Sequence, residues 1–455
     1  MGHYEATRRR HLAHAATLLP GQLERLTWPA NRIAAERQER LRELLRAAQA
    51  RSPWHAARLR GVDAERFRED DLAQLPRMTK SDLMSHWDDI VTDRRASLAG
   101  ADQHLARLTS DEYLHGDLHA VASGGSTGVR GVFLFGWREW AAAYCGFART
   151  LLRERATAAD LAGLPASVAF VAAECATHMT SSMAQTFANP NIHIERFPVT
   201  WPLADIVAGL NAAQPVMLLG YPSGLALLAV EARAGRLRIS PRRVLATSEP
   251  LLPHVRRAVE EAFAAPVANV WGTSEAGPMG VGCWRSPGMH LCDDMIIVEP
   301  VDLAGRTVPP GTRSDAILVT AIANPTLPLI RYEISDQMTF LAEPCACGSA
   351  HRRIADVEGR LDDVFIYAGG VTVHPHLFRS GLLVESGLVE YQVRQTARGA
   401  EIFVIGSLRD RDAAARGLES ALSRLGVSDP RIGFHPVEQL ERQPTGKVRR
   451  FLPLA

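Results

Sequence analysis

The stretch "VMLLGYPSGLALLAVEARAGRLRISPRRVLATSEP" (residues 216–250) places a longer amphipathic segment between two short apolar runs. The apolar runs favour strands, and the segment between them has apolar residues at helical spacing. The alternation continues outward, because "ASVAFVAA" and "VANVWGTSE" predict further strands and "LADIVAGLNAAQ" and "LLPHVRRAVEEAFAA" predict further helices. This pattern predicts an α/β fold with a parallel-rich sheet, whose ligands bind in loops at the carboxyl ends of the strands.

The chain has 455 residues, which is more than one hydrophobic core usually serves, so we expect at least two domains. After residue 360 the pattern changes to a strand pair around "VEYQVRQTARGAEIFVIGS", a helix in "RDAAARGLESALSRLG" and a terminal strand. The sequence therefore predicts a large N-terminal core domain, residues 1–360, and a small C-terminal α+β domain, residues 361–455.

The composition is that of an ordinary globular protein, with 46% hydrophobic and 22% charged residues and a net charge of +1. A near-neutral chain gives no electrostatic reason to expect nucleic acid or an anionic membrane as partner. The N-terminal residues lack the apolar core of a signal peptide, and no run reaches the roughly 18 apolar residues of a membrane-spanning helix. We expect a soluble, cytoplasmic enzyme or binding protein.

The stretch "ASGGSTGVRG" (residues 122–131) combines glycines with hydroxyl side chains. Glycines let backbone N–H groups approach an anion closely, and Ser and Thr add donors. The stretch lacks the lysine of a Walker A loop, so a flexible loop and a phosphate-binding loop are both open. The candidate phosphate-binding residues are Ser123, Gly124, Gly125, Ser126, Thr127 and Gly128.

Further polar residues follow predicted strands. In "NVWGTSEAG" (residues 269–277), Trp271 can offer an aromatic face to a base, and Glu275 can hold Mg2+ near phosphates. A core tryptophan and a helix-capping glutamate are the alternative. In "LIRYEISDQ" (residues 329–337), Asp336 can bind ribose hydroxyls, or it can form an Asx turn.

A set of soft ligands has the spacing C-x6-H…C-x-C. Its members are Cys283, His290, Cys345 and Cys347. Three thiolates and one imidazole commonly hold structural Zn2+, but free thiols are equally open in a chain of this kind. Cys292 and His351 are reserve ligands.

Lysine is rare, since only Lys80 and Lys447 occur while arginine supplies the other basic side chains. Thr79 and Asp82 are spaced as a capping box, which makes Lys80 an exposed residue in the first turn of a helix. Lys447 lies in the short polar stretch "PTGK" near the C-terminus.

Taken in order, "ASGGSTGVRG", "SEP", "NVWGTSEAG", "RYEISD", "GRLDD" and "PTGK" resemble the core motifs of the adenylate-forming (acyl-CoA synthetase, AMP-binding) superfamily. The segment "LPRMTKSDL", the chain length and the cysteine set are similar to its phenylacetate–CoA ligase branch. The resemblance implies a large adenylate-forming domain followed by a small, mobile C-terminal lid domain. It also implies ATP and Mg2+ as cofactors, possible use of CoA and possible structural Zn2+.

The resemblance also implies residue roles. The loop from Ser123 to Gly128 would hold the pyrophosphate of ATP. Adenine would be lined by Ser248, Glu249 and Pro250 and bordered by Trp271, Gly272 and Thr273. Ser274 would contact the α-phosphate, Glu275 would associate with Mg2+, and Asp336 and Arg360 would bind ribose. Asp362 would be the hinge, although a charged linker is the alternative, and Lys447 would be the lysine that promotes adenylation.

The implied reaction joins a carboxylic acid to AMP and releases pyrophosphate, after which CoA accepts the acyl group. The chain departs from the family where Val129 and Arg130 replace a common Lys-Pro, and where Ile366 or Tyr367 replaces a common lysine. These departures leave CoA open as the acceptor. An amine or a carrier protein is an alternative acceptor, and nitrite an alternative small oxyacid to be activated.

The acid pocket is expected to include "VAAECATHMTSSM" (residues 171–183). Glu174 and His178 share a face if this segment is helical, so a buried acid there would meet a substrate amine; a polar pair at the rim is the alternative. Tyr221 is a third pocket candidate. The small-molecule acid is not specified by these residues, and a homodimer is possible.

Overall fold

The computed structural model describes residues 2–123, 131–172, 176–188, 192–199, 201–357, 359–360, 365–373, 377–378, 382, 388–408, 410–442 and 448–454. The chain divides into two compact units. Unit 1 comprises Met1–Ala166, Glu174–His193 and Ala268–Val357, and unit 2 comprises Ser167–Ala173, Ile194–Val267 and Glu358–Ala455. The boundary expected at residue 360 stays a prediction. Within the described ranges, no helix combines the length and the apolar character needed to span a membrane.

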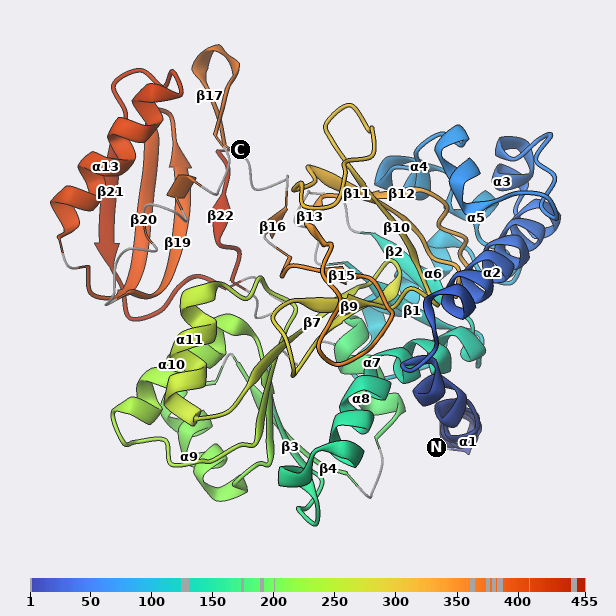
Figure 1. Cartoon of the computed structure of the whole chain (residues 1–455), viewed down its shortest axis with the longest axis horizontal. Coiled ribbons are helices and arrows are strands. Elements are labelled where there is room, and N and C mark those ends of the chain that lie inside the picture. Colours follow the sequence, from blue (N-terminus) through green and yellow to red (C-terminus); the bar gives the residue numbers. More distant parts are fainter. Residues whose placement is uncertain are drawn as a thin grey trace. The chain divides into compact units, whose positions relative to one another are not determined.

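Unit 2 contains the sheet predicted from the opening stretch. Its strands lie in the order β6-β5-β3-β4, and the pairs β3·β5 and β5·β6 are parallel. The strands are β3 (Ser167–Ala172), β4 (His193–Pro198), β5 (Met217–Gly220) and β6 (Arg243–Thr247). The connecting helices are α9 (Leu203–Ala213), α10 (Pro222–Arg233) and α11 (Pro253–Phe263). The predicted strands and helices of this region are confirmed (Figure 1).

The helices of this sheet begin and pack for simple reasons. Pro222 and Pro253 open α10 and α11, where a missing N–H costs nothing and the fixed φ suits the helix. Val255, Val259 and Phe263 recur every fourth residue of α11, so they form one buried stripe. The strand β6 is buried along its whole length, as expected of a parallel strand covered on both faces.

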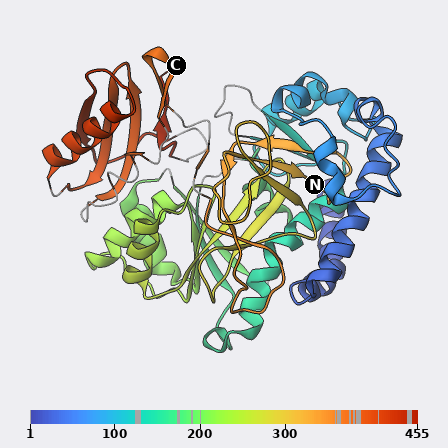
Figure 2. The same ribbon diagram turned by 45° about the horizontal axis from the view of Figure 1, so that its top comes forward.

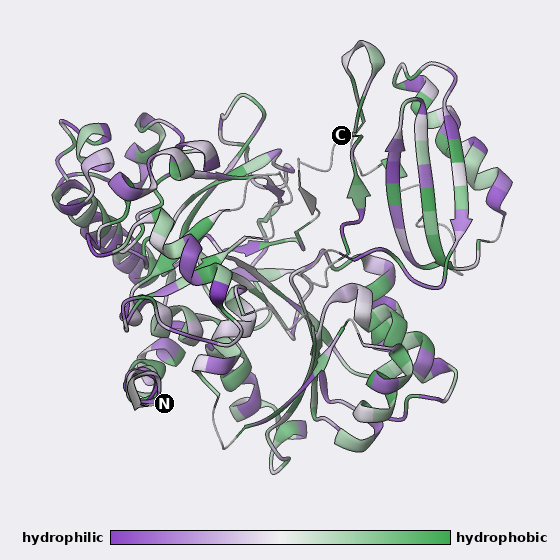
Figure 3. Cartoon of the chain, turned by 180° about the vertical axis from the view of Figure 1, so that it is seen from behind, coloured by the Kyte–Doolittle hydropathy of each residue, from purple (hydrophilic) through white to green (hydrophobic). Residues whose placement is uncertain are grey.

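The C-terminal part of unit 2 is an α+β arrangement, as predicted. The hairpin β17 (Phe365–Tyr367)·β18 (Val371–Val373) precedes a sheet of order β21-β20-β19-β22. Its strands are β19 (Leu388–Thr396), β20 (Gly399–Gly406), β21 (Arg431–Pro436) and β22 (Phe451–Leu452), with α13 (Arg411–Arg424) between β20 and β21. Hydrophobic and hydrophilic bands alternate along these strands (Figure 3). One hydrophobic cluster runs through both sheets of unit 2.

Unit 1 carries the N-terminal helices and mostly antiparallel strands. The helix α1 (Gly2–Arg25) packs along α7 (Trp137–Thr157), and α2 (Ala30–Arg51) follows α1 (Figure 2). The shorter helices are α3 (Pro53–Arg58), α4 (Lys80–Ser85), α5 (Trp87–Ile90), α6 (Leu98–Arg107) and α8 (Met179–Thr186).

The strands of unit 1 pair antiparallel with one another, partly as hairpins with short connections and partly between segments distant in the sequence. They are β1 (His119–Ala122), β2 (Val132–Phe135), β7 (Val267–Thr273), β8 (Gly277–Gly282), β9 (Met289–Leu291), β10 (Ile297–Val301), β11 (Ala316–Thr320), β12 (Tyr332–Ile334), β13 (Asp336–Gln337), β14 (Phe340–Leu341) and β15 (Arg353–Ile354). The parallel pairing that the sequence predicted is therefore found in unit 2.

Candidate active site and metal centre

The glycine-rich stretch is the connection between β1 and β2. Ser123 and Gly131 close its base, because Ser123 N donates to Gly131 O at 2.9 Å and Gly131 N donates to Ser123 Oγ at 3.0 Å. The pairing of His119 with Phe135 through Ala122 with Val132 brings these two residues together. Residues 124–130 between them lie outside the described part of the chain.

Lys80 is placed differently from the expectation of an exposed first-turn residue. Thr79 and Asp82 do form the predicted capping box of α4. However, the Lys80 side chain is half-buried, and its Nζ lies 3.2 Å from Ser123 Oγ. A Cβ added to Gly131 would lie 3.1 Å from Lys80 Cε. The structure therefore brings a lysine to the base of the glycine-rich loop, a position that sequence spacing did not reveal because 43 residues separate it from Ser123.

Trp271 and Asp336 meet directly in unit 1. The indole Nε1 donates to Asp336 Oδ2 at 2.9 Å, and the two side chains are 6% and 5% exposed. The sequence assigned these residues to adenine and to ribose, which are adjacent parts of one nucleotide, and the contact agrees with neighbouring roles. Arg331 anchors the segment before Asp336 through a bidentate pair with Glu299, with N–O distances of 3.0 and 2.9 Å.

Ser274 and Glu275 lie in the tight turn of the β7·β8 hairpin, so the alternative of a helix-capping glutamate is wrong. Thr273 Oγ1 accepts a hydrogen bond from Ala276 N at 3.0 Å and fixes this turn. Gly272 is needed for close packing, since a Cβ there would lie 2.6 Å from the ring of Phe147.

The charge of Glu275 acts on a neighbouring tyrosine. Burial, together with the negative charge of Glu275, raises the pKa of Tyr332 well above its usual range. Tyr332 is 2% exposed, so it stays a neutral phenol at physiological pH. Glu275 thus places a negative charge close to the buried side chain of Tyr332.

In unit 2, Ser248, Glu249 and Pro250 follow β6 directly. Ser248 has a left-handed backbone, with φ of 68°, which is uncommon for a residue other than glycine. Such strain persists only where surrounding contacts fix it, and it clusters at functional positions. Glu249 is buried and accepts hydrogen bonds from Ser223 N at 3.0 Å and Ser223 Oγ at 3.2 Å.

The pocket candidates are only partly described. His178 has extended backbone and immediately precedes α8, so the proposed helical face shared with Glu174 is wrong at this residue. Tyr221 is buried at the start of α10. Several other site residues expected from the sequence lie outside the described part of the chain, or have a side chain that does. They are Glu174, Gly124, Gly125, Ser126, Thr127, Gly128, Arg360, Asp362 and Lys447.

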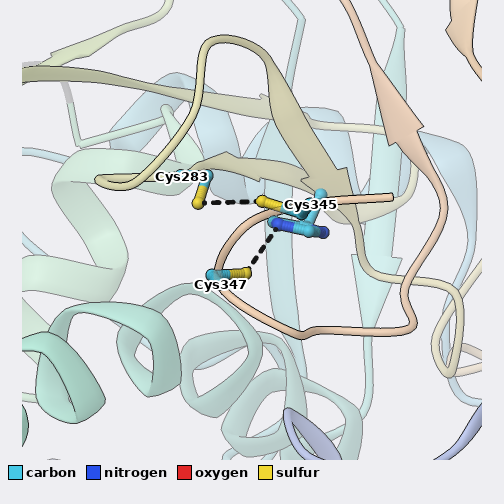
Figure 4. Close-up of side chains that lie close together, drawn as sticks. Cys283, Cys345 and Cys347 are labelled. Atoms are coloured by element: carbon cyan, nitrogen blue, oxygen red, sulfur yellow. Dashed lines mark hydrogen bonds between the residues drawn. The ribbon is translucent and has the colours of Figure 1, made fainter. Parts of the chain in front are cut away.

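The four soft ligands gather in unit 1. The ligand atoms of Cys283, His290, Cys345 and Cys347 all lie within 4.8 Å of one another. Cys283 Sγ is 3.4 Å from Cys345 Sγ, and Cys347 Sγ is 3.3 Å from His290 Nε2 (Figure 4). Three sulfurs and one nitrogen converging in this way fit the tetrahedral donor set of structural Zn2+.

The elements around the cluster explain its geometry. Cys283 follows β8, His290 lies in β9, and the two remaining cysteines lie in the connection from β14 to β15, which pairs with β9. His290 Nδ1 lies 3.2 Å from the carbonyl of His351, which orients Nε2 towards the sulfurs. The reserve ligands are therefore not needed: Cys292 is buried beside Arg149, and the ring of His351 lies 3.2 Å from Arg25 O.

No protein-family model matches the chain. The chain is 27% identical to a phenylacetate-coenzyme A ligase of Thermus thermophilus over 479 residues, which covers 95% of this chain and 99% of the relative. This near-complete match confirms the expected resemblance. The chain is thus similar, along nearly its whole length, to a phenylacetate–CoA ligase.

Solved structures show the same fold. A 2-hydroxyisobutyryl-CoA ligase in the postadenylation state, in complex with R3-HIB-AMP, has a TM-score of 0.70 at 22% identity, with 94% of this chain and 91% of that chain covered. An open conformation of the same ligase, in complex with 2-HIB-AMP and CoA, has a TM-score of 0.61 at 20% identity, with coverages of 95% and 93%. The expected α/β adenylate-forming fold is confirmed.

Proposed function

We propose that the protein is an AMP-forming ligase that activates a small carboxylic acid with ATP and transfers the acyl group to CoA. The observation that carries this proposal is the match to a phenylacetate-coenzyme A ligase along nearly the whole chain. It is supported by the Trp271–Asp336 contact and the position of Glu275 in unit 1, which suit a nucleotide and its Mg2+.

The first half-reaction forms a bond between a carboxylate oxygen of the acid and the α-phosphorus of ATP, and it breaks the bond to pyrophosphate. In the second, the CoA sulfur loses its proton and attacks the acyl carbon, and AMP leaves. Trp271 and Asp336 would hold adenosine, Glu275 would hold Mg2+, and Ser274 would contact the α-phosphate. Mg2+ neutralises phosphate charge when bound.

Two lysines supply positive charge in this proposal. Lys447 would approach the α-phosphate, where a preorganised cation stabilises the charge that gathers in the transition state. Lys80 would contact the phosphates from the base of the glycine-rich loop, since its Nζ is already 3.2 Å from Ser123 Oγ. An ammonium group suits both positions because it is a compact point charge on a flexible stem.

We further propose that Cys283, His290, Cys345 and Cys347 bind structural Zn2+. The ligand distances within 4.8 Å support this, as does the carbonyl of His351 behind His290. Elemental analysis of the purified protein should find close to one equivalent of zinc. Less than about half an equivalent would contradict a site that folds with its metal.

A different acceptor is the second candidate. The family resemblance places Ile366 or Tyr367 where many members carry a lysine, and Ile366 is 66% exposed on the β17·β18 hairpin. Tyr367, in contrast, is buried and donates its OH to Gly399 O at 2.9 Å, which is a structural role. An exposed isoleucine would suit an apolar partner surface, such as that of a carrier protein, better than the phosphates of CoA.

Release of pyrophosphate over a panel of carboxylic acids, with and without CoA, tests these proposals. Turnover with at least one acid that yields a CoA thioester is the expected result. Turnover indifferent to CoA would favour the second candidate, and no turnover with any acid would contradict adenylation of carboxylic acids. Because ATP and CoA are intracellular metabolites, a cytoplasmic location is part of the proposal. A homodimer stays a prediction, for which sedimentation is the test.

A further inference from the structure

The two chain positions that bracket "QPTGK" are held by the same pair of residues. Arg442, the last described residue before this stretch, donates from Nη1 to Ser223 Oγ at 3.2 Å. Val448, the first described residue after it, donates its backbone N–H to Glu249 Oε1 at 2.8 Å. Ser223 and Glu249 are themselves joined by two hydrogen bonds. We propose that Ser223 and Glu249, here called the receiver pair, position the lysine stretch for adenylation.

The receiver pair is built to be rigid. Ser223 lies in the first turn of α10, and its free N–H donates to Glu249 Oε2 at 3.0 Å. A carboxylate is favoured there because helix N-termini carry unpaired N–H groups and partial positive charge. Ser223 and Glu249 are 1% and 9% exposed, so water does not compete freely for either side chain. The left-handed backbone of Ser248 directs the chain at the end of β6, immediately before Glu249.

The other side of the contact is organised by the C-terminal sheet. Gln392 in β19 donates from Nε2 to the carbonyls of Glu441, at 3.3 Å, and of Arg449, at 2.9 Å. One buried side chain therefore ties together the two ends of the lysine stretch. The pairing of β22 with β19 anchors the chain that follows Val448. The ends of the stretch consequently belong to the C-terminal sheet, and the receiver pair binds them from the parallel-sheet part of unit 2.

The consequence for the reaction follows from covalent geometry and rests on the proposed function. Val448 is the residue next to Lys447, so a hydrogen bond on its backbone N–H fixes the chain within one residue of the proposed adenylating lysine. Both carboxylate oxygens of Glu249 accept from protein donors, so Ser223 and Glu249 act on Lys447 as positioning residues, in addition to the place beside adenine that the family resemblance gives Glu249. Their contacts to Arg442 and Val448 favour the arrangement used for adenylation, and these two contacts are not required for attack by CoA on the finished adenylate.

The first test needs no substrate. Hydrogen–deuterium exchange of residues 448–454 is measured in the full-length protein and in Glu249→Ala, Glu249→Gln and Glu441→Gln. A hydrogen bond to a charged acceptor is lost in Glu249→Ala, so exchange at the Val448 amide should quicken by about tenfold to hundredfold. Glu249→Gln keeps an acceptor oxygen and should restore part of the protection. Glu441→Gln is the matched control, because that side chain is 66% exposed and pairs at the surface with Arg394.

The second test separates the half-reactions with an acid found in the pyrophosphate-release panel. Arg442→Ala should slow adenylation by about tenfold or more, mainly in kcat, while thioester formation from purified acyl-adenylate is unchanged. Glu249→Ala, which also alters the expected adenine wall, should slow adenylation at least as much. Equal losses of Arg442→Ala in both half-reactions, a rise only in its KM for ATP, or unchanged exchange in Glu249→Ala would overturn the receiver pair. If Glu249→Ala fails to fold, Glu249→Gln and Arg442→Ala decide. If the wild type forms no adenylate, the proposed function fails, and exchange alone decides whether the contact exists.

Discussion

The hydrogen bond between Trp271 and Asp336 offers a sharp test of the nucleotide site. Replacing Trp271 with Phe keeps an aromatic ring and removes the indole N–H, which now donates to Asp336 Oδ2 at 2.9 Å. The Asp336 side chain is only 5% exposed, so bulk water cannot freely replace the lost donor. The carboxylate assigned to the ribose would then be held less firmly.

The size of the effect follows from these contacts. A hydrogen bond to a charged acceptor contributes about 1.5–3 kcal/mol, which corresponds to about tenfold to hundredfold in an equilibrium constant. Asp336 has further polar interactions, so its carboxylate is not left alone by the substitution. We therefore expect the lower end of this range, a dissociation constant for ATP that rises by about tenfold.

Isothermal titration calorimetry with ATP and Mg2+ measures this change without knowledge of the acid substrate. The matched control is Trp28→Phe, because its indole N–H donates to Glu24 at 3.0 Å and the Glu24 side chain is 56% exposed. The control should bind ATP like the wild type. Unchanged affinity in Trp271→Phe, or an equal loss in both variants, would refute the assignment of Trp271 and Asp336 to adenosine.

Four further outcomes are expected. Lys80→Met should weaken ATP binding by about tenfold, because one charge-assisted hydrogen bond is lost, and Lys80→Arg should recover part of the affinity. If Lys80→Met binds ATP as tightly as the wild type, Lys80 is not part of the nucleotide site. Lys447→Ala should slow adenylation by about 10²–10³ while affecting thioester formation from supplied acyl-adenylate far less. Equal loss of rate in both half-reactions would indicate that Lys447 has a structural role. Cys345→Ser should lose zinc by elemental analysis, whereas Cys292→Ser should retain it; retention in both would contradict the cluster. Burial lowers the pKa of His55 from 6.5 to about 3, so the unfolded chain takes up this proton first as the pH falls. Between pH 6.5 and about 3, this uptake should lower the free energy of unfolding, measured with urea, by about 1.4 kcal/mol for each pH unit, in addition to the effect of other groups. If a His55→Gln variant shows the same pH dependence as the wild type, this explanation is wrong.

Local sequence patterns predicted the elements well where periodicity is strong. The strands and helices between residues 165 and 275, the β19·β20 pair and α13 all lie where alternation and helical spacing placed them. The capping box of α4 was predicted from two residues, because both hydrogen bonds are local. Motif order, which depends only on the linear sequence, was enough to indicate the superfamily.

The prediction for Lys80 shows where local patterns stop being sufficient. Its capping box was correct, yet its Nζ lies 3.2 Å from Ser123 Oγ, because the partner of a side chain on a helix surface depends on residues distant in the sequence. The helical pairing of Glu174 with His178 was wrong for a related reason, since α8 begins only at Met179. Helix boundaries depend on tertiary contacts that spacing does not contain.

The sequence by itself determined the kinds of chemistry available: a glycine-rich loop, acids after strands, a lone lysine in "PTGK" and four soft ligands. Only the tertiary structure decided which of these side chains meet. Cys283 and Cys345 lie 62 positions apart and Glu249 and Val448 lie 199 apart, yet each pair is in contact. The physical reason is that residue type and short spacing set local conformation, whereas contacts between distant residues follow from how sheets and helices bury their apolar faces against one another.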